Sequence, residues 1–424
     1  MASNNSNTSG QSQSNSQRVD AEPSVSESSV SEPANSESSS SVANKLAGYR
    51  QQIDNVDAEL VALLAKRQGI TKQVGDLKRL HSMPIYVPER EATLIYERRK
   101  QAEALGVSGD LIEDVLRRAM RDSYYSQHAN YARVNDKISK VVVVGGGGAL
   151  GKVIVGLFSS SEYQVTVVEK DTWDNRSELM QDADLVIIAV PINQTLHVIN
   201  NLPELPDNCV LADVTSIKTE PVQAMLNKHK GPVVGLHPMF GPDAPGMIKQ
   251  VVVVCDGRRP ENYAWLIEQM QVWGAQIYAT QAQTHDKAMA FIQVMRHFNT
   301  FVYGQHLQQE DPDLTQLIAF SSPIYRLELA MVGRLFAQAP SLYADIIFNN
   351  QSNVELLERF HERFGQALQL VKSQNKAGFI ECFKEVELWF GDYAKQCLID
   401  SKQMLLKADD GQLLRKIDKL NSPK

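Results

Sequence analysis

Residues 141–151 read VVVVGGGGALG, an apolar β-branched run that passes directly into four glycines. The valine run is typical of a strand buried on both faces of a parallel sheet, and the residues after the glycines predict a helix. The spacing G-x-G-x-x-G falls on this junction. Because backbone N–H groups and the helix dipole favour an anion at such a helix start, the stretch predicts a dinucleotide-binding Rossmann unit. The expected cofactor contacts here are Gly146, Gly148, Ala149, Leu150 and Gly151.

A second predicted strand, YQVTVV, ends at Glu169, eighteen residues past the last glycine. A carboxylate there can accept hydrogen bonds from the ribose hydroxyls and repels a 2′-phosphate, which favours NAD over NADP. Five more strands are predicted at DADLVIIAVP, CVLADV, GPVVGLHP, VVVVCDG and AQIYAT, with helical segments between them. This alternation predicts a mainly parallel, doubly wound sheet.

Ligands of such sheets lie outside the carboxyl ends of the strands. Pro191, the segment 215–218 and the segment 236–242 follow predicted strands and are expected at this edge. A neutral His237 could accept a hydroxyl proton while a hydride leaves the same carbon. The alternative is a histidine held by backbone hydrogen bonds in a loop rich in proline and glycine. The histidines expected on the surface are His81, His128, His197, His229, His306 and His361.

The segment from Leu46 to Leu77 has apolar residues spaced alternately by three and four, which predicts one long helix with a single apolar seam. Arg67 fills the one gap in the seam, and Arg50 and Lys78 lie beside it. A buried arginine needs an anionic partner; alternatively, its stem packs while its head reaches water. At about 1.5 Å per residue, the helix is too long to bury its seam within one small domain, which predicts an intertwined homodimer.

Two further helices are predicted, from Pro88 to about Ala104 and from Asp110 to about Tyr131. Together with the motifs ALLAKR, VGDLK, PIYVPERE and RDSYYSQ, the region resembles the all-helical chorismate mutase domain. The resemblance implies a site formed by Arg50, Arg67, Lys78, Arg90, Glu91, Ser123 and Gln127, with Arg50 reaching the site of the partner chain.

The resemblance also implies a role for each group. Lys78 and Gln127 would contact the ether oxygen, the two seam arginines the carboxylates, and Glu91 the ring hydroxyl. Val87 stands where mutase domains fused to prephenate dehydratase carry an acid, so the resemblance leaves one polar substrate contact open.

Beyond Thr284, helical periodicity replaces the strand pattern. Arg334 lies within the strongly apolar segment LAMVGRLF, and Arg326 lies two turns earlier. Each is either part of a buried structural ion pair or a bidentate clamp for a substrate carboxylate. His297, in another apolar helix, is ambiguous in the same way.

Residues 138–409, through motifs such as LHPMFGPD, HDKAMAFIQVMRHF and SSPIYRLELAMVGRLFAQ, resemble prephenate dehydrogenase. With the mutase-like region before it, the chain resembles the bifunctional chorismate mutase–prephenate dehydrogenases. The resemblance implies NAD as cofactor, chorismate and prephenate as substrates, tyrosine as feedback inhibitor and no metal. It implies that Ser216 and His237 contact the ring hydroxyl and Arg334 a carboxylate, with Lys218, His297 and Arg326 around them. Ala344 stands where many relatives carry a further arginine.

The 424 residues predict a multidomain α and α/β chain. The expected parts are a disordered tail rich in Ser, Asn, Gln and Glu (1–42), a helical mutase domain (43–131), an NAD-binding Rossmann domain (138–283), a helical dimerisation and substrate domain (284–409) and a C-terminal tail (410–424). A net charge of −7 gives no reason to expect nucleic-acid binding, and no run approaches the ~20 apolar residues of a membrane span. Four cysteines without metal or redox spacing suit a reducing, cytoplasmic location.

Three interpretations follow from the sequence. The preferred one is a bifunctional enzyme of tyrosine biosynthesis. The second is a prephenate dehydrogenase with a non-catalytic helical arm, against which the cations Arg67 and Lys78 argue. The third is an NAD-sensing regulator without catalytic activity, which leaves the mutase-like residues unexplained.

Overall fold

The computed structural model describes residues 39–81, 83–126, 131–241, 244, 246–348 and 351–421. The chain divides into two compact units between Leu64 and Ala65, and each unit is considered by itself. The described part of the first unit is the beginning of helix α1 (Ser39–Leu80). Its apolar seam is exposed along its length, for example at Ile53 and Leu60. The rest of the predicted N-terminal tail lies outside the described residues.

The three predicted N-terminal helices are present as α1, α2 (Pro88–Ala104) and α3 (Gly109–Ser126). Pro88 occupies the first turn of α2, where its missing N–H costs no hydrogen bond. Two predicted boundaries are wrong. Helix α1 begins at Ser39, within the predicted tail, because neither proline nor glycine lies between Ser39 and Leu46. Tyr131 lies outside α3 and is buried in the core of the sheet domain.

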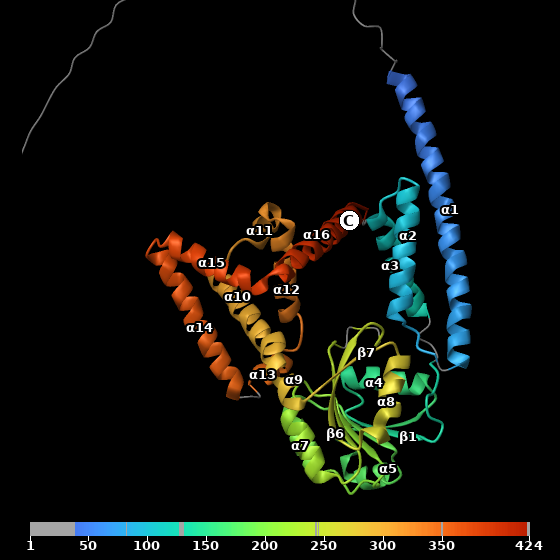
Figure 1. The fold of residues 1–424 in the computed structure, drawn as a ribbon, viewed down its shortest axis with the longest axis vertical. Coiled ribbons are helices and arrows are strands. Elements are labelled where there is room, and N and C mark those ends of the chain that lie inside the picture. The colour runs from blue at the N-terminus through green and yellow to red at the C-terminus, as the bar shows by residue number, and fades with distance from the viewer. Residues whose placement is uncertain are drawn as a thin grey trace, which may run out of the picture. The chain divides into compact units, whose positions relative to one another are not determined.

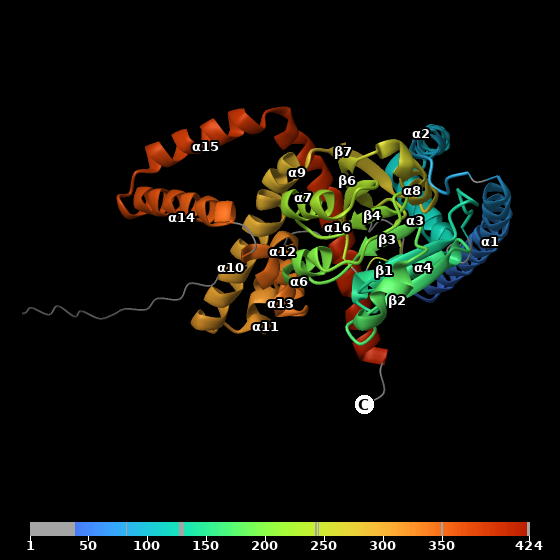
Figure 2. The same cartoon turned by 90° about the horizontal axis from the view of Figure 1, so that it is seen from below.

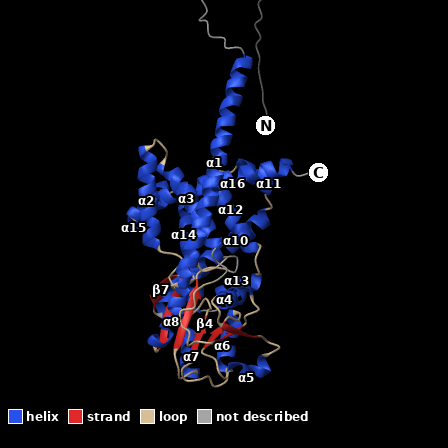
Figure 3. Ribbon diagram, turned by 90° about the vertical axis from the view of Figure 1, so that its right-hand side faces the viewer, coloured by secondary structure: helices blue, strands red, loops and turns tan. Residues whose placement is uncertain are grey.

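The second unit contains a seven-stranded sheet, as predicted (Figure 3). Its strands are β1 (Lys140–Val144), β2 (Gln164–Val168), β3 (Leu185–Ile188), β4 (Val210–Asp213), β5 (Val233–Pro238), β6 (Val251–Arg258) and β7 (Gln276–Thr280). Their order is β2-β1-β3-β4-β5-β6-β7, and all neighbours are parallel except β5 and β6. The sheet is therefore doubly wound with one antiparallel pair.

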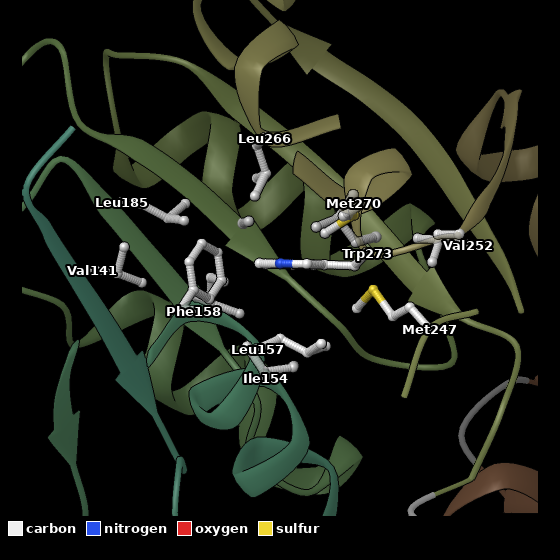
Figure 4. Packing of buried hydrophobic residues seen from close by; sticks show 14 of the residues in the cluster. Val141, Ile154, Leu157, Phe158, Leu185, Met247, Val252, Leu266, Met270 and Trp273 are labelled. Carbon is white, nitrogen blue, oxygen red and sulfur yellow. The ribbon is translucent and has the colours of Figure 1, made fainter. Parts of the chain in front are cut away.

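Alternate residues of the strands face two separate cores, which explains the uninterrupted valine run. Val141 and Val143 pack beneath α4 (Ala149–Ser160) and α8 (Pro260–Val272). There the rings of Phe158 and Trp273 meet edge to face with centroids 4.8 Å apart (Figure 4). Val142 on the opposite face packs with α5 (Arg176–Met180), α6 (Ile192–Asn200) and α7 (Thr219–Lys228). A short 3₁₀ turn, η1 (Trp173–Asn175), precedes α5.

The region after the sheet is helical, as predicted (Figures 1 and 2). Its elements are α9 (Ala282–Met289), the π-helical segment η2 (Ala290–Met295), α10 (Arg296–Glu310), α11 (Leu314–Phe320), α12 (Pro323–Phe336), α13 (Pro340–Phe348), α14 (Gln351–Lys372), α15 (Lys376–Phe390) and α16 (Asp392–Asn421). Figure 2 shows α14 and α15 meeting at a short turn. Helix α16 includes residues 410–421 of the predicted C-terminal tail, where Leu413, Leu414, Ile417 and Leu420 continue the helical spacing. Within the described residues, no helix is long and apolar enough to span a membrane.

The glycine turn offers a test of the fold. A Cβ on Gly151 would overlap the carbonyl oxygen of Gly145 and lie 2.8 Å from the Cα of Gly146. These are backbone atoms that cannot rotate away, so Gly151→Ala should lower the free energy of unfolding by about 2–4 kcal/mol. Gly156 lies in the same helix with nothing within 4 Å of a Cβ, so Gly156→Ala should raise it by about 0.5–1 kcal/mol. Denaturant unfolding measures both, and equal effects of the two substitutions would contradict this packing.

Candidate active sites

The glycine turn between β1 and α4 forms a cradle that side chains would fill. Gly145 has a φ of +82°, which L-residues rarely adopt. A Cβ on Gly146 would lie 2.9 Å from Val167, and one on Gly148 would lie 3.2 Å from the carbonyl oxygen of Gly145. Gly148 is the N-cap of α4 and has no side chain to cap the helix. The first-turn N–H groups of α4 therefore face outward, where an anion can accept their hydrogen bonds.

Glu169 and Pro191 follow β2 and β3, the strands on either side of β1, as predicted. The Glu169 carboxylate accepts a hydrogen bond from the N–H of Gly147, which holds the acid beside the glycine turn. A carboxylate can accept several further hydrogen bonds, so ribose hydroxyls fit here. Pro191 is exposed and is the N-cap of α6. The residues present fit a dinucleotide whose pyrophosphate lies on the start of α4.

His237 lies near the carboxyl end of β5 and is only 3% exposed. Its Nδ1 is 2.8 Å from Nε2 of His285, and its Nε2 is 3.3 Å from the side-chain nitrogen of Gln293. His285 is itself buried, and its Nδ1 is 2.8 Å from Oδ1 of Asp286. These three partners are not among the site residues that the sequence predicts. The adjacent polar pair at the start of HDKAMA, next to an apolar helix, is the signal that could have indicated two of them.

Burial lowers the pKa of His237 well below its usual value, and the positive charge of Lys218 and the ring of His285 lower it further. The charge of Asp286 acts in the opposite direction but does not outweigh them. The ring is therefore neutral near pH 7. A neutral, buried imidazole at the sheet edge can take up a proton, as the functional interpretation requires.

Lys218 and Asp213 form a fully buried ion pair, 0% exposed on both side chains. The Lys218 ammonium also donates to the carbonyl oxygen of Leu236, 2.8 Å away and directly before His237. Burial lowers the pKa of Lys218, while the Asp213 carboxylate opposes that shift. The pair therefore ties β4 to the backbone that carries the histidine. Ser216 lies between Asp213 and Lys218 in the sequence, and its side chain is partly buried.

Arg334, the predicted carboxylate clamp, lies in a different environment from the one that its apolar sequence neighbours suggest. Arg334 is exposed in the last turn of α12, because Val332 and Leu335 occupy the buried face of this helix. The side chain of Arg334 is therefore not buried within this chain. Arg326 is partly buried and donates to the carbonyl oxygen of Ser321 at 2.6 Å.

His297 lies on α10 with its ring edge-on to Tyr343, the centroids 4.8 Å apart. Burial, together with the neighbouring charge of Arg296, lowers the pKa of His297 to about 4. Within the described residues its Nδ1 is buried without a hydrogen-bond partner. The sequence predicts that His297 lies around the residues that contact the substrate. An uncharged ring whose Nδ1 has no hydrogen-bond partner in the described part of the chain suits that position.

In the mutase-like region, the structure brings two predicted residues together. Arg67 donates to the hydroxyl of Ser123 at 3.2 Å and to the carbonyl oxygen of Ala119 at 3.4 Å. Thr71 donates to the same hydroxyl at 3.2 Å. Lys78 donates to two carbonyl oxygens in the turn after α1, and burial lowers its pKa. Arg67 is thus held between α1 and α3, and Lys78 is held at the end of α1 by the following turn.

Glu91 belongs to a different cluster. It is 7% exposed and accepts from Lys249 at 2.6 Å, from Tyr124 at 3.1 Å and from Arg117 at 3.2 Å. Burial and the carboxylate of Glu91 raise the pKa of Tyr124, so the phenol remains a donor.

The remaining mutase residues are not brought together. Arg90 is exposed on α2, and Arg50 is exposed in the first unit. Gln127 lies outside the described residues. His229, predicted on the surface, is instead buried with Nε2 2.8 Å from the carbonyl oxygen of Cys209. His81, His197, His306 and His361 are exposed as predicted, and His128 lies outside the described residues.

Comparison with known proteins places this geometry in a family. Residues 49–128 match the model for chorismate mutase type II, residues 151–274 the nucleotide-binding domain of prephenate dehydrogenase, and residues 281–385 its dimerization domain. A T-protein of Enterobacter agglomerans is 52% identical over 87% of this chain and 99% of its own length. A T-protein of Haemophilus influenzae is 48% identical over the same shares of each chain. The chain belongs to the T-protein family.

Among solved structures, a prephenate dehydrogenase from A. aeolicus, in complex with hydroxyphenyl propionate and NAD⁺, is also similar to this chain. It has 15% sequence identity and a TM-score of 0.49, and the match covers 59% of this chain and 96% of the other.

The burial of His237 and the charges around it predict the pH range in which its ring stays neutral. Because its pKa is lowered, the ring should stay neutral as the pH falls through about 6.5, where an unperturbed histidine takes up its proton. Ring ¹⁵N NMR of the folded protein, with the signal assigned by its loss in His237→Asn, measures this directly. A His237 ring that is half protonated at or above pH 6.5 would contradict the burial and charges described here.

Proposed function

We propose that this chain catalyses two consecutive reactions of tyrosine biosynthesis. The first rearranges chorismate to prephenate, and the second is the NAD-dependent oxidative decarboxylation of prephenate to 4-hydroxyphenylpyruvate. The observation that carries the proposal is the buried, neutral His237 at the same sheet edge as the glycine turn. The mutase reaction rests on Arg67 and Lys78 on one helix of a chorismate mutase type II region.

In the second reaction, His237 accepts the proton of the ring hydroxyl at Nε2. The glycine turn and Glu169 would hold NAD, which would supply the acceptor for the hydride that leaves the same ring carbon. The resulting dienone is conjugated to the carbon that bears the ring carboxylate, so carbon dioxide departs and the ring becomes aromatic. Ser216 would bond the hydroxyl oxygen, and Arg334 would hold a carboxylate by its bidentate fork. Lys218, Arg326 and His297 would shape the surroundings.

NAD is the cofactor that the glycine turn and Glu169 fit. Gly146 and Gly151 allow the tight turn and its close packing. Gly148 would let the backbone approach the pyrophosphate, and the first residues of α4, Ala149 and Leu150, would direct backbone N–H groups toward it. The acid beside the turn would bond the ribose hydroxyls and repel a 2′-phosphate.

The first reaction needs no nucleophile, because it is a rearrangement within one dianion. Cations that hold both carboxylates in a folded pose, and donors to the ether oxygen as its bond breaks, are sufficient. Arg67 and Arg50 would hold the carboxylates, Arg50 from the partner chain. Lys78 and Gln127 would donate to the ether oxygen. Glu91 would contact the ring hydroxyl, with Arg90 and Ser123 completing the site.

We further propose a homodimer that is inhibited by tyrosine, the end product. The exposed apolar seam of α1 and the match of residues 281–385 to a dimerization domain support the dimer. Inhibition by tyrosine is supported by the resemblance to the bifunctional enzymes. All four cysteines are free thiols, which suits action in the reducing cytoplasm.

Two substitutions should separate the activities. Arg67→Ala should abolish conversion of chorismate while NADH formation from supplied prephenate stays near normal, because this cation serves only the mutase site. His237→Asn should show the reverse pattern, with the dehydrogenase kcat lowered by about 10²–10⁴-fold, because an amide cannot take up the proton. Each variant is the folding control for the other. Loss of both activities in either folded variant would refute the assignment of separate sites.

A further inference from the structure

The hydrogen bonds around His237 form one continuous chain whose donors can be assigned. It runs from Asp286 through His285 to His237 and ends at Gln293. Each link has one hydrogen bond, and the four side chains come from three elements: His237 from β5, His285 and Asp286 from α9, and Gln293 from the π-helical segment η2. Since each bond needs one donor and one acceptor, the two ends determine the protons between them.

The Asp286 end sets the first proton. Its carboxylate accepts from the backbone N–H groups of Lys218 and Thr219, at 2.8 and 2.9 Å, at the start of α7. Contacts with N–H donors, above all the imidazole of His285, lower the pKa of Asp286 against the raising effect of its burial. The carboxylate is therefore ionised and can only accept, so the Nδ1 of His285 carries the proton. With this proton on Nδ1, the Nε2 of His285 is the ring nitrogen that can accept a hydrogen bond.

The orientation of the Gln293 amide agrees with this assignment. An amide nitrogen can only donate, so the Nε2 of His237, 3.3 Å away, accepts. The remaining proton of the neutral His237 ring must lie on Nδ1, which donates to the Nε2 of His285. Both ends thus fit the same arrangement of protons.

We infer that Asp286 and His285 are positioning residues that hold His237 in the tautomer with an unprotonated Nε2. This inference rests on the proposed function, in which that Nε2 accepts the hydroxyl proton. When it does, the His237 ring becomes an imidazolium that keeps its Nδ1–H bond to His285. The anionic end of the chain then faces the new positive charge through one intervening ring.

The first test measures the tautomer in the unmodified enzyme. The ring ¹⁵N spectrum of histidine-labelled protein, assigned with His237→Asn, should show the His237 proton on Nδ1 and an unprotonated Nε2. A proton on Nε2 in the resting enzyme would overturn the inference whether or not any variant folds.

The second test uses a graded pair at position 285. His285→Leu fills the buried space but accepts no hydrogen bond, so the dehydrogenase kcat should fall by about 10²-fold or more with little change in KM for prephenate. His285→Gln places a carbonyl oxygen that can accept from Nδ1 of His237, so it should restore most of that loss. Equal activity in the two variants would overturn the inference.

Asp286→Asn tests the anionic end. An asparagine has one acceptor oxygen for three N–H groups, so kcat should fall and the His237 ring should show a mixture of tautomers. Asp313→Asn is the matched control, because Asp313 caps α11 through two backbone N–H groups and contacts no histidine there. It should leave kcat and the ring spectrum unchanged.

The outcomes separate the two proposals. If His237→Asn retains the wild-type kcat, the proposed function of His237 is wrong. If His237→Asn loses activity while His285→Leu and Asp286→Asn retain it, the proposed function stands and the positioning role is wrong. The mutase rate of each variant reports that the chain is folded.

Discussion

A parallel sheet that is buried on both faces brings the carboxyl ends of its strands to one edge, and the dehydrogenase chemistry depends on that constraint. β1 ends at the glycine turn, β2 ends beside Glu169, and β5 carries His237 near its end. Two apolar cores cover the faces, so polar groups gather at the edge. The buried pair of Lys218 and Asp213 stabilises this edge from within, and removal of one partner of such a pair costs about 3–5 kcal/mol.

The two proposed sites have opposite electrostatic requirements. The dehydrogenase site keeps His237 neutral by burial and by nearby positive charge, so that it can take up a proton. The mutase site instead needs charge at rest, because its substrate carries two carboxylates. Arg67 and Lys78 therefore hold their places through oxygen acceptors such as the hydroxyl of Ser123 and the carbonyl of Ile85, which do not neutralise them.

The sequence was sufficient to predict the sheet, its parallel strands and the helical regions, because these follow from local periodicity and from glycine positions. It also indicated His237, because a polar residue at the end of a buried strand is visible in the pattern. It could not indicate that His285 bonds His237, since that contact joins residues 48 apart through the packing of α9 against the sheet edge. The burial of His229 could not be predicted either, because the carbonyl oxygen that its ring bonds is twenty residues away in the sequence. The exposure of Arg334 depends on which face of α12 is covered, which apolar neighbours alone do not decide.

The central claim is that one chain performs both reactions. The most direct measurement incubates the purified protein with chorismate, with and without NAD, and follows chorismate loss and NADH formation separately. If one chain performs both reactions, chorismate disappears in both cases and NADH forms, after prephenate, only when NAD is present. Chorismate that persists while supplied prephenate still yields NADH would contradict the claim and favour a dehydrogenase with a non-catalytic helical arm.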